Sequence, residues 1–224
     1  METTWTDVDE YFVQQLAPAD ELMTETLAAS AAAGLRPISV TPPQGKLLHL
    51  IARMIGARRI LEIGTLGGYS TIWMGRALPR DGRLITLEID PAAAAVARQN
   101  IARAGLGDRV ELMLAPAADS LRRLASDRAA PFDLVFIDAD KASSDSYFAA
   151  ALELSRAGAI IIVDNVVRDG KVVDADSTDA DILGIRRLME LVAREPRVDA
   201  TAIQTVGSKG YDGFLLARVV SEAR

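Results

Sequence analysis

The stretch Phe132-Asp133-Leu134-Val135-Phe136-Ile137-Asp138-Ala139-Asp140-Lys141 begins as a continuous apolar run and ends in two acids and a lysine. Such a run is typical of a strand that is buried on both faces of a parallel sheet. Because side chains alternate along a strand, Asp138 and Asp140 are expected to point the same way where the strand ends. The stretch therefore predicts a buried parallel strand with polar side chains at its carboxyl end.

A second stretch repeats this design, because Ala159-Ile160-Ile161-Ile162-Val163 runs directly into Asp164 and Asn165. In an open parallel sheet, ligands bind at the carboxyl ends of the strands. Two neighbouring strands would therefore bring Asp138, Asp164 and Asn165 to one crevice. Three oxygen donors suit a hard divalent cation better than zinc, which prefers nitrogen and sulfur. Mg²⁺ is the expected ion, with Mn²⁺ and Ca²⁺ as alternatives.

The chain around these stretches alternates strands with helices, which predicts a Rossmann-like α/β fold with a doubly wound, mostly parallel sheet. A gap of only 207–211 separates the last two strands, so they should pair antiparallel. The sheet is then seven-stranded with an antiparallel last strand. The predicted strands are 59–63, 83–88, 109–114, 132–137, 158–163, 199–206 and 212–219, and the helices between them are 68–78, 91–104, 116–128, 143–155 and 178–194.

The N-terminal part precedes this alternating unit. Residues 5–33 are predicted to form two helical pieces broken near Pro18, with Asp20 capping the second. A loop over 35–43 and a helix over 44–55 follow, and His49, the only histidine, receives no role. We expect a single domain in which 1–34 forms a lid or a subunit contact and 35–224 forms the core.

The composition excludes several classes of protein. The 224 residues carry a net charge of −6, which argues against a nucleic-acid partner. The absence of cysteine excludes disulfides, zinc–thiolate sites and cysteine nucleophiles. The N-terminus lacks the apolar segment of a signal peptide, and no apolar run approaches the length of a membrane span. These features predict a cytoplasmic protein with no membrane partner.

A glycine-rich loop follows the first predicted strand, in Leu61-Glu62-Ile63-Gly64-Thr65-Leu66-Gly67-Gly68-Tyr69-Ser70. Alone it is a weak signal of nucleotide binding. Leu66 stands where a dinucleotide motif has its second glycine, and Glu62 would repel a phosphate but not a cationic ligand. Glu88 ends the next strand, twenty positions beyond Gly68, where an acid can accept hydrogen bonds from ribose hydroxyls.

Five stretches together resemble class I S-adenosyl-L-methionine (SAM) methyltransferases, and more narrowly the cation-dependent O-methyltransferases that include catechol and caffeoyl-CoA O-methyltransferases. The resemblance covers about residues 35–219 in family order. The most specific part of the resemblance is the pairing of FDLVFIDADK (132–141) with VDN (163–165). The stretches are LEIGTLGGYS (61–70), LEID (87–90), FDLVFIDADK (132–141), VDN (163–165) and VGSKGYDGF (206–214).

The resemblance implies roles for individual residues. Asp138, Asp164 and Asn165 would be the metal ligands, and Lys141 would be the catalytic base, assisted by Asp138. The implied SAM contacts are Val40, Glu62, Gly64, Thr65, Ser70, Glu88, Ala117 and Asp140. One departure is Ala115-Pro116-Ala117, where relatives often have glycine first. The resemblance also implies a homodimer and a small catechol-like acceptor.

The implied reaction moves a methyl group from SAM to one hydroxyl of a vicinal diol. A phenol has a pKa near 10, so a divalent cation that binds both oxygens would favour the reactive phenolate. Two alternatives stay open: an NAD-dependent oxidoreductase on a related sheet, and a non-catalytic nucleotide-binding module. Arg168, Lys209 and Tyr211 lie near the predicted site, and no role is assigned to them.

Overall fold

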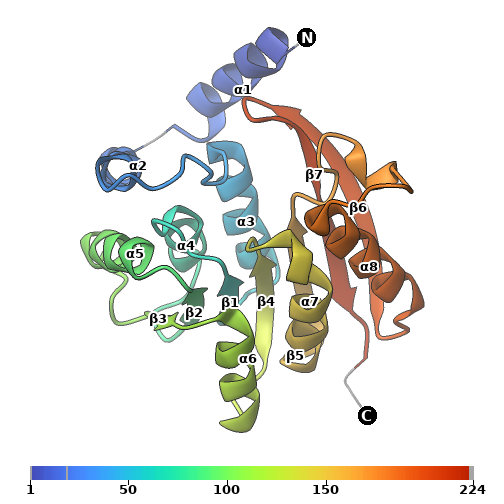
Figure 1. Ribbon diagram of the computed structural model, residues 1–224. Helices are drawn as coiled ribbons and strands as arrows, with labels where there is room; N and C mark the ends of the chain where they lie inside the picture. Colours follow the sequence, from blue (N-terminus) through green and yellow to red (C-terminus); the bar gives the residue numbers. More distant parts are fainter. Residues whose placement is uncertain (1, 19, 222–224) are drawn as a thin grey trace.

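The computed structural model describes residues 2–18 and 20–221, so the ends of the predicted domain and Ala19 lie outside the described residues. One seven-stranded sheet runs through the molecule in the order β3-β2-β1-β4-β5-β7-β6 (Figure 1). Strands β1 to β5 are parallel, and β7 is antiparallel to both of its neighbours. The predicted fold class is confirmed. The strands are β1 Arg59–Ile63, β2 Arg83–Glu88, β3 Val110–Leu114, β4 Phe132–Ile137, β5 Ser155–Asp164, β6 Val198–Gly207 and β7 Gly210–Val219.

Helices cover both faces of this sheet, and their bounds agree with the predicted ones to within a few residues. A clear difference lies at 42–43, which were predicted as loop but open α3. Thr41 caps this helix by accepting from Gln44 N (3.4 Å), and a proline at the first helical positions needs no N–H partner. The helices are α1 Glu2–Leu16, α2 Glu21–Ala32, α3 Pro42–Met54, α4 Tyr69–Gly75, α5 Pro91–Arg103, α6 Ala117–Ser126, α7 Ser144–Glu153 and α8 Ala180–Arg194, with short 3₁₀ helices η1 Lys141–Ser143 and η2 Lys171–Val173.

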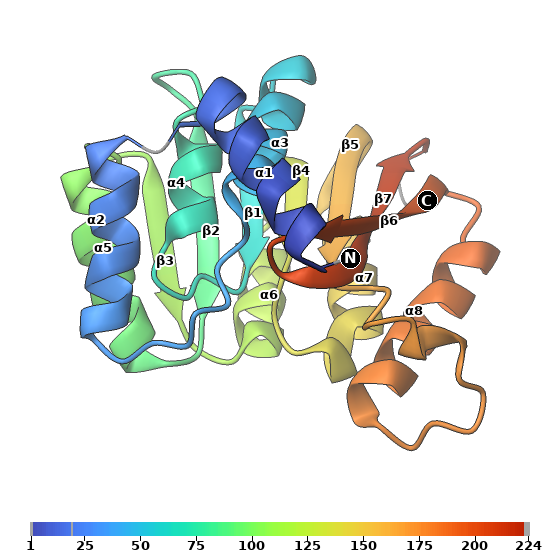
Figure 2. The ribbon, with the colours of Figure 1, turned by 90° about the horizontal axis from the view of Figure 1, so that it is seen from above.

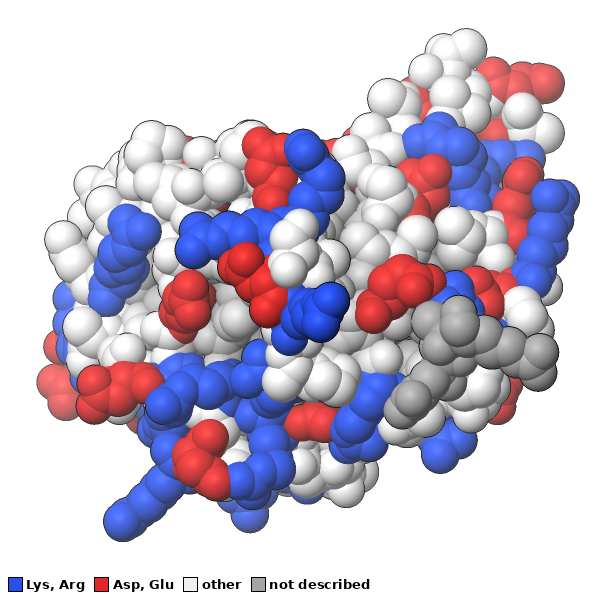
Figure 3. All heavy atoms as spheres, turned by 90° about the horizontal axis from the view of Figure 1, so that it is seen from below, with Lys and Arg blue, Asp and Glu red and all other residues white. Residues whose placement is uncertain are grey.

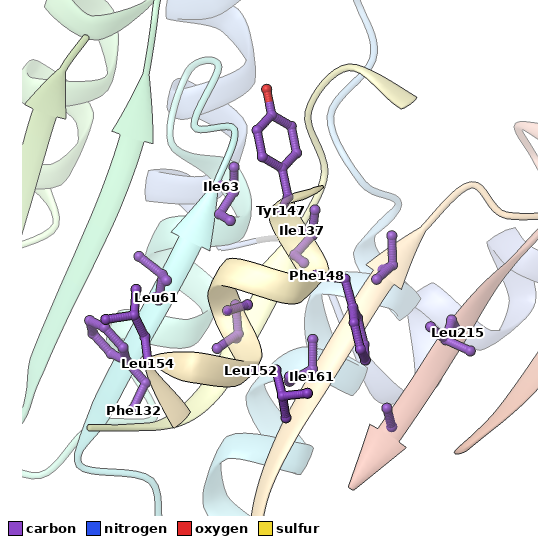
Figure 4. Packing of buried hydrophobic residues seen from close by; sticks show 14 of the residues in the cluster. Leu61, Ile63, Phe132, Ile137, Tyr147, Phe148, Leu152, Leu154, Ile161 and Leu215 are labelled. Carbon is purple, nitrogen blue, oxygen red and sulfur yellow. The ribbon is translucent and has the colours of Figure 1, made fainter. Parts of the chain in front are cut away.

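Alternation along the central strands divides the core into two layers. Leu61, Val135 and Ile161 point to one face, where α6, α7 and α8 pack, and Figure 4 shows this cluster around Phe148. Ile60, Leu134 and their neighbours point to the other face, against α3, α4 and α5. Strands buried on both faces carry continuous apolar runs, which explains why the central strands were readable from sequence.

The order of strands creates a switch point at β1, whose two neighbours are β2 and β4. Ligands in open α/β sheets bind outside the carboxyl ends of the strands at such a point. Strand β5 begins at Ser155 rather than at 158, because Ser155 pairs with Phe132 across a register shift in β4. The strand β7 lies between β5 and β6, so the last strand of the chain is paired on both sides and the preceding strand β6 forms the edge of the sheet.

The helix α1 lies across the carboxyl edge of the sheet, beside the turn between β6 and β7 (Figure 2). Asp9 connects the two segments, because its Oδ2 accepts from Ser208 N at 2.8 Å. The helix α2 begins at the predicted cap, where Asp20 accepts from Met23 N at 2.9 Å. A lid or dimer role for 1–34 stays a prediction. Within the described residues, none of the helices combines the length and apolar character that crossing a membrane requires.

The face seen from below carries charged side chains of both signs (Figure 3). Basic residues are numerous there, but acidic residues lie among them. This face therefore lacks an unbroken basic surface.

Candidate active site

Two predicted metal ligands meet where β4 and β5 leave the sheet. Ile137 and Val163 are register partners, so Asp138 and Asp164, one residue further along each strand, lie side by side at the carboxyl edge. Asn165 follows with a positive φ of 58°, a conformation that asparagine tolerates better than most residues. The structure thus brings Asp138, Asp164 and Asn165 to the same edge, as the sequence predicts.

Asp164 is a buried acid, with 5% of its surface exposed. Burial, followed by the neighbouring carboxylate of Asp138, raises its pKa to about 7, while Lys141 and a hydrogen bond from Gln44 act in the opposite direction. Burial and a neighbouring carboxylate both disfavour the ionised form of a carboxyl group. A cation at this edge would remove that disadvantage.

The donor set can be tested against a divalent cation. Asp138 and Asp164 offer carboxylate oxygens and Asn165 offers an amide oxygen, which are ligands that Mg²⁺ accepts. Within 2–18 and 20–221, no group of three or more His, Cys, Asp or Glu side chains could hold a metal ion, so the amide is needed as the third protein donor. Mg²⁺ commonly keeps several waters and few carboxylates, so this oxygen set fits it.

Lys141 lies directly beside these acids. Its Nζ donates to Asp138 Oδ1 at 2.8 Å, and only 7% of its side chain is exposed. It belongs to η1, which follows β4 after a single turn. A buried lysine at the carboxyl edge, paired with a predicted metal ligand, is placed where a proton acceptor for a bound hydroxyl would be needed.

Asp140 has a different partner from Asp138. Its Oδ1 accepts from the hydroxyl of Tyr147 at 2.6 Å, and burial, followed by this bond, raises the pKa of Tyr147 to about 12. The alternation expected for Asp138 and Asp140 does not apply, because β4 ends at Ile137, before both acids. The turn after β4 directs the two acids to different partners, and the alternation of side chains along a strand plays no part in this.

The glycine loop lies against the same turn. A Cβ at Gly64 would meet the backbone carbonyl of Asp138, with the carbonyl carbon at 2.8 Å and the oxygen closer still. Gly64 also has a φ of +99°, which other residues rarely adopt. Only glycine therefore lets the first loop and the turn after β4 approach this closely, and a cofactor in the loop would lie next to the predicted metal ligands.

Glu88 anchors the glycine loop from β2. Its Oε2 accepts from Thr65 N (3.2 Å) and Leu66 N (2.8 Å), and its Oε1 accepts from Ile89 N (2.8 Å) and Asp90 N (2.9 Å). Four bonds match the acceptor capacity of one carboxylate. Ribose hydroxyls would share or replace some of these bonds, and the ribose role of Glu88 stays a prediction.

Glu62 lies beneath the loop with no exposed surface. Its carboxylate accepts from Ser70 (2.6 Å), Thr71 (2.5 Å) and Thr86 (2.7 Å), and Thr86 is in turn bonded to Thr65 at 2.5 Å. Burial raises the pKa of Glu62 to about 7, although the three hydroxyl bonds lower it. The predicted SAM contacts Glu62, Thr65 and Ser70 therefore form one hydroxyl network that supports the loop.

This network predicts a pH effect on stability. The pKa of Glu62 is about 7 in the folded chain against an ordinary value of 4.5, so folding favours the protonated form. The contribution is fully present below pH 4.5 and is lost as pH rises toward 7, because only the unfolded chain then releases its proton. Between pH 5 and pH 7.5, the free energy of unfolding should fall by roughly 2–3 kcal/mol more in the wild type than in Glu62→Gln.

Urea unfolding at both pH values checks this prediction. The exposed Glu111→Gln on β3 is the matched control and should retain the pH dependence of the wild type. Identical pH dependence in the Glu62→Gln variant and the wild type would contradict the prediction.

The remaining predicted SAM contacts lie around this loop. Val40 is buried just before α3, and its side chain packs in the core cluster of α3 and α4, which leaves its backbone for a ligand. Ala117 is the first residue of α6, and the preceding Ala115 N donates to Glu88 O at 3.0 Å. Both positions border the carboxyl edge, and their contacts with SAM stay predictions.

The structure adds Lys209 and Gln44 to the surroundings of the two acids. Lys209, in the turn between β6 and β7, donates to the carbonyl of Ser39, and it faces Asp138 and Asp164, which oppose the lowering of its pKa by burial. The other two unassigned residues bond elsewhere: Arg168 pairs with Asp181 at 3.2 Å, and Tyr211 bonds to Gln204. No local sequence signal marks Gln44, whereas Lys209 lies in a stretch already singled out.

Comparisons with known proteins agree with one another. A family model described as O-methyltransferase matches residues 14–220. The chain is 52% identical over 213 residues to catechol O-methyltransferase of Mycobacterium tuberculosis, which covers 95% of each protein. The structure of the O-methyltransferase from Bacillus cereus in complex with SAH has a TM-score of 0.96 at 54% identity and covers 98% of this chain and 100% of that one. TomG of Streptomyces achromogenes, an O-methyltransferase involved in tomaymycin synthesis and solved with SAM, has a TM-score of 0.95 at 49% identity, covering 98% and 99%.

Proposed function

This chain belongs to the O-methyltransferase family, and from that assignment we propose that it transfers a methyl group from SAM to one hydroxyl of a small vicinal diol of the catechol type, with a divalent cation beside the acceptor. The SAM- and SAH-bound relatives support the methyl donor. The name of the relative from Mycobacterium tuberculosis supports a catechol-type acceptor.

One observation carries the finer part of the proposal. Asp138, Asp164, Asn165 and Lys141 converge at the carboxyl edge of β4 and β5, and Gly64 of the cofactor loop packs on the backbone of Asp138. A methyl donor in the loop and an acceptor at the acids would therefore be neighbours. Transfer of an already activated methyl group depends mainly on such positioning.

The glycine loop, Glu88 and the Glu62 network would hold SAM, whose sulfonium supplies the activated methyl group. Glu88 already fixes the backbone of Thr65 and Leu66, so the loop has its shape before a ligand binds. Asp140, whose carboxylate accepts from Tyr147, would be a further contact of SAM. A preformed loop reduces the ordering that binding would otherwise require.

Asp138, Asp164 and Asn165 would hold the cation, which when bound lowers the pKa of a hydroxyl that contacts it and fixes its orientation. Lys141 pairs with Asp138 as a donor, so its amine would first release this bond and give up one proton; the neutral Nζ would then accept the proton of the acceptor hydroxyl. Since Lys141 is almost fully buried, bulk water has little access to this proton transfer.

Chelation tests this proposal. With catechol and SAM, the protein supplied with Mg²⁺ should form the monomethyl ether, and excess EDTA should lower the rate by about 100-fold or more, because the cation supplies several kcal/mol of charge stabilisation. Mass spectrometry would follow the product. Resorcinol, whose hydroxyls are not adjacent, is the matched control and should not be methylated at a comparable rate.

Full activity in EDTA would contradict the cation, and equal rates with catechol and resorcinol would contradict the vicinal diol. A titration with NAD addresses the oxidoreductase alternative, which predicts tight NAD binding and no SAM binding. Failure to methylate any catechol in the presence of SAM and Mg²⁺ would favour a binding module.

A further inference from the structure

The segment that carries Lys141 is supported by α8, a helix that holds none of the predicted site residues. A Cβ at Gly184 of α8 would lie 2.7 Å from Ala142 Cα and 2.8 Å from Ala142 O, and closer still to the carbonyl oxygen of Lys141. Real Cβ atoms essentially never approach backbone this closely. The two backbones are therefore in direct contact at Gly184, and Figure 1 shows α8 beside α7, which follows η1.

Glycine is an unfavourable choice in the middle of this helix. It costs about 1 kcal/mol relative to alanine at an interior helical position. The φ of Gly184 is not in the left-handed region, so the backbone conformation does not require glycine. The close approach to η1 is the feature of the structure that accounts for it.

A second contact fastens the same segment one turn along α8. Arg187 Nη2 donates to Ala142 O at 2.7 Å, and its Nε pairs with Asp145 of α7 at 3.1 Å. The neighbours Ile185 and Leu188 are fully buried in the core and fix the position of the helix. At its N-terminus α8 also reaches the loop after the metal-site residues, through Asp181 and Arg168.

We propose that Gly184 and Arg187 are positioning residues, which place the backbone of η1 so that the Lys141 amine reaches Asp138 and the acceptor hydroxyl. This inference rests on the proposed function of Lys141. The Lys141 side chain is buried and its Nζ lies 2.8 Å from Asp138, so a shift of the η1 backbone would move this amine relative to Asp138. The helix α8 supplies this restraint from outside the site.

Gly184→Ala should move η1 away from α8 and lower kcat for catechol about 10- to 100-fold, the effect expected of a displacement of about 1 Å at a reacting group. The affinity for SAM, measured by calorimetry, should change less than kcat, because Asp140 is the predicted SAM contact nearest to the displaced segment and most of the others lie on the glycine loop, β2 and α6; the KM for catechol should also change less than kcat. Gly107→Ala is the matched control, because a Cβ there meets nothing within 4 Å, and it should retain wild-type kinetics.

A double-mutant cycle separates positioning from general damage. In a Lys141→Ala background, Gly184→Ala should cause little further loss of kcat, because the group that it positions is already absent. A merely structural role predicts that the two losses multiply. Hydrogen exchange gives a readout besides activity: amides of the segment from Asp138 to Ser146 should exchange faster in Gly184→Ala than in the wild type, and those of β1 should not.

Arg187→Ala is the second variant, and it tests the proposal even if Gly184→Ala does not fold. Its side chain is half exposed, and its loss should lower kcat about 3- to 10-fold, as expected for the ordinary net contribution of one hydrogen bond. Multiplicative losses in the cycle, or wild-type kcat in both α8 variants when Lys141→Ala is impaired, would overturn the inference. Wild-type turnover in Lys141→Ala would instead refute the proposed role of the lysine, and with it any positioning through it.

Discussion

Replacement of Lys141 by alanine is expected to lower the rate of catechol methylation by about 10²- to 10⁴-fold, the usual contribution of a positioned acid or base. The buried amine lies 2.8 Å from Asp138 and is the proposed proton acceptor at the carboxyl edge. SAM affinity should change little, because the predicted SAM contacts do not depend on this side chain; even the adjacent Asp140 is bonded to Tyr147 and not to Lys141. The loss should therefore appear in kcat and not in the binding of the methyl donor.

Turnover under saturating SAM and Mg²⁺, together with calorimetric SAM binding, would measure these two effects. Lys171→Ala is the matched control, because Lys171 is an exposed lysine of η2 and its loss should leave both values unchanged. Thermal unfolding of the two variants would show that the fold is retained. Near-normal turnover in Lys141→Ala would remove the base from the mechanism, and a parallel loss of SAM binding would indicate a disturbed cofactor loop.

Replacement of Asp164 by asparagine is the second large expected effect. The substitution keeps the shape of the side chain but removes one of the two carboxylates of the predicted metal site. Methylation at a fixed Mg²⁺ concentration should fall by about 100-fold or more, because the cation is expected to contribute several kcal/mol to the reaction. A higher Mg²⁺ concentration should recover part of the loss if the main defect is weaker binding of the cation.

The same substitution should not destabilise the metal-free fold. Asp164 is buried beside Asp138, and burial disfavours its charge, so a neutral side chain of the same size removes an unfavourable interaction. Thermal unfolding in EDTA at neutral pH should therefore give an unchanged or higher midpoint. Asp199→Asn, at an exposed acid on β6, is the control for both measurements. Normal activity with a lower midpoint would mean that Asp164 is a structural acid.

The sequence could predict some of the features on which these expectations depend, namely the strands and the residues at their ends. Buried parallel strands produce continuous apolar runs, and their ends are marked by acids and glycines. The fold class, the placement of Asp138 and Asp164 at the carboxyl ends of two strands, and the loop from Gly64 to Gly68 followed from these local patterns. Sequence separation is irrelevant to such patterns, because each is confined to one strand and the turn after it.

Contacts between distant segments could not be predicted in this way. The division of Asp138 and Asp140 between Lys141 and Tyr147 depends on where β4 ends, and the full burial of Glu62 depends on Thr86 from another strand. Glycine is unusual inside a helix, so Gly184 could have suggested a close contact. The neighbouring residues in the sequence do not indicate which segment it contacts.

The sequence by itself determined the sheet, the edge where a ligand binds, and the residue types available there, because burial imposes a periodic pattern on each element. Only the tertiary structure decided which of these side chains meet, that β7 lies between β5 and β6, and that α8 presses against the segment of Lys141. The physical reason is that hydrogen bonds and steric contacts act over a few ångströms in space. The order of residues along the chain constrains such distances only within a single element.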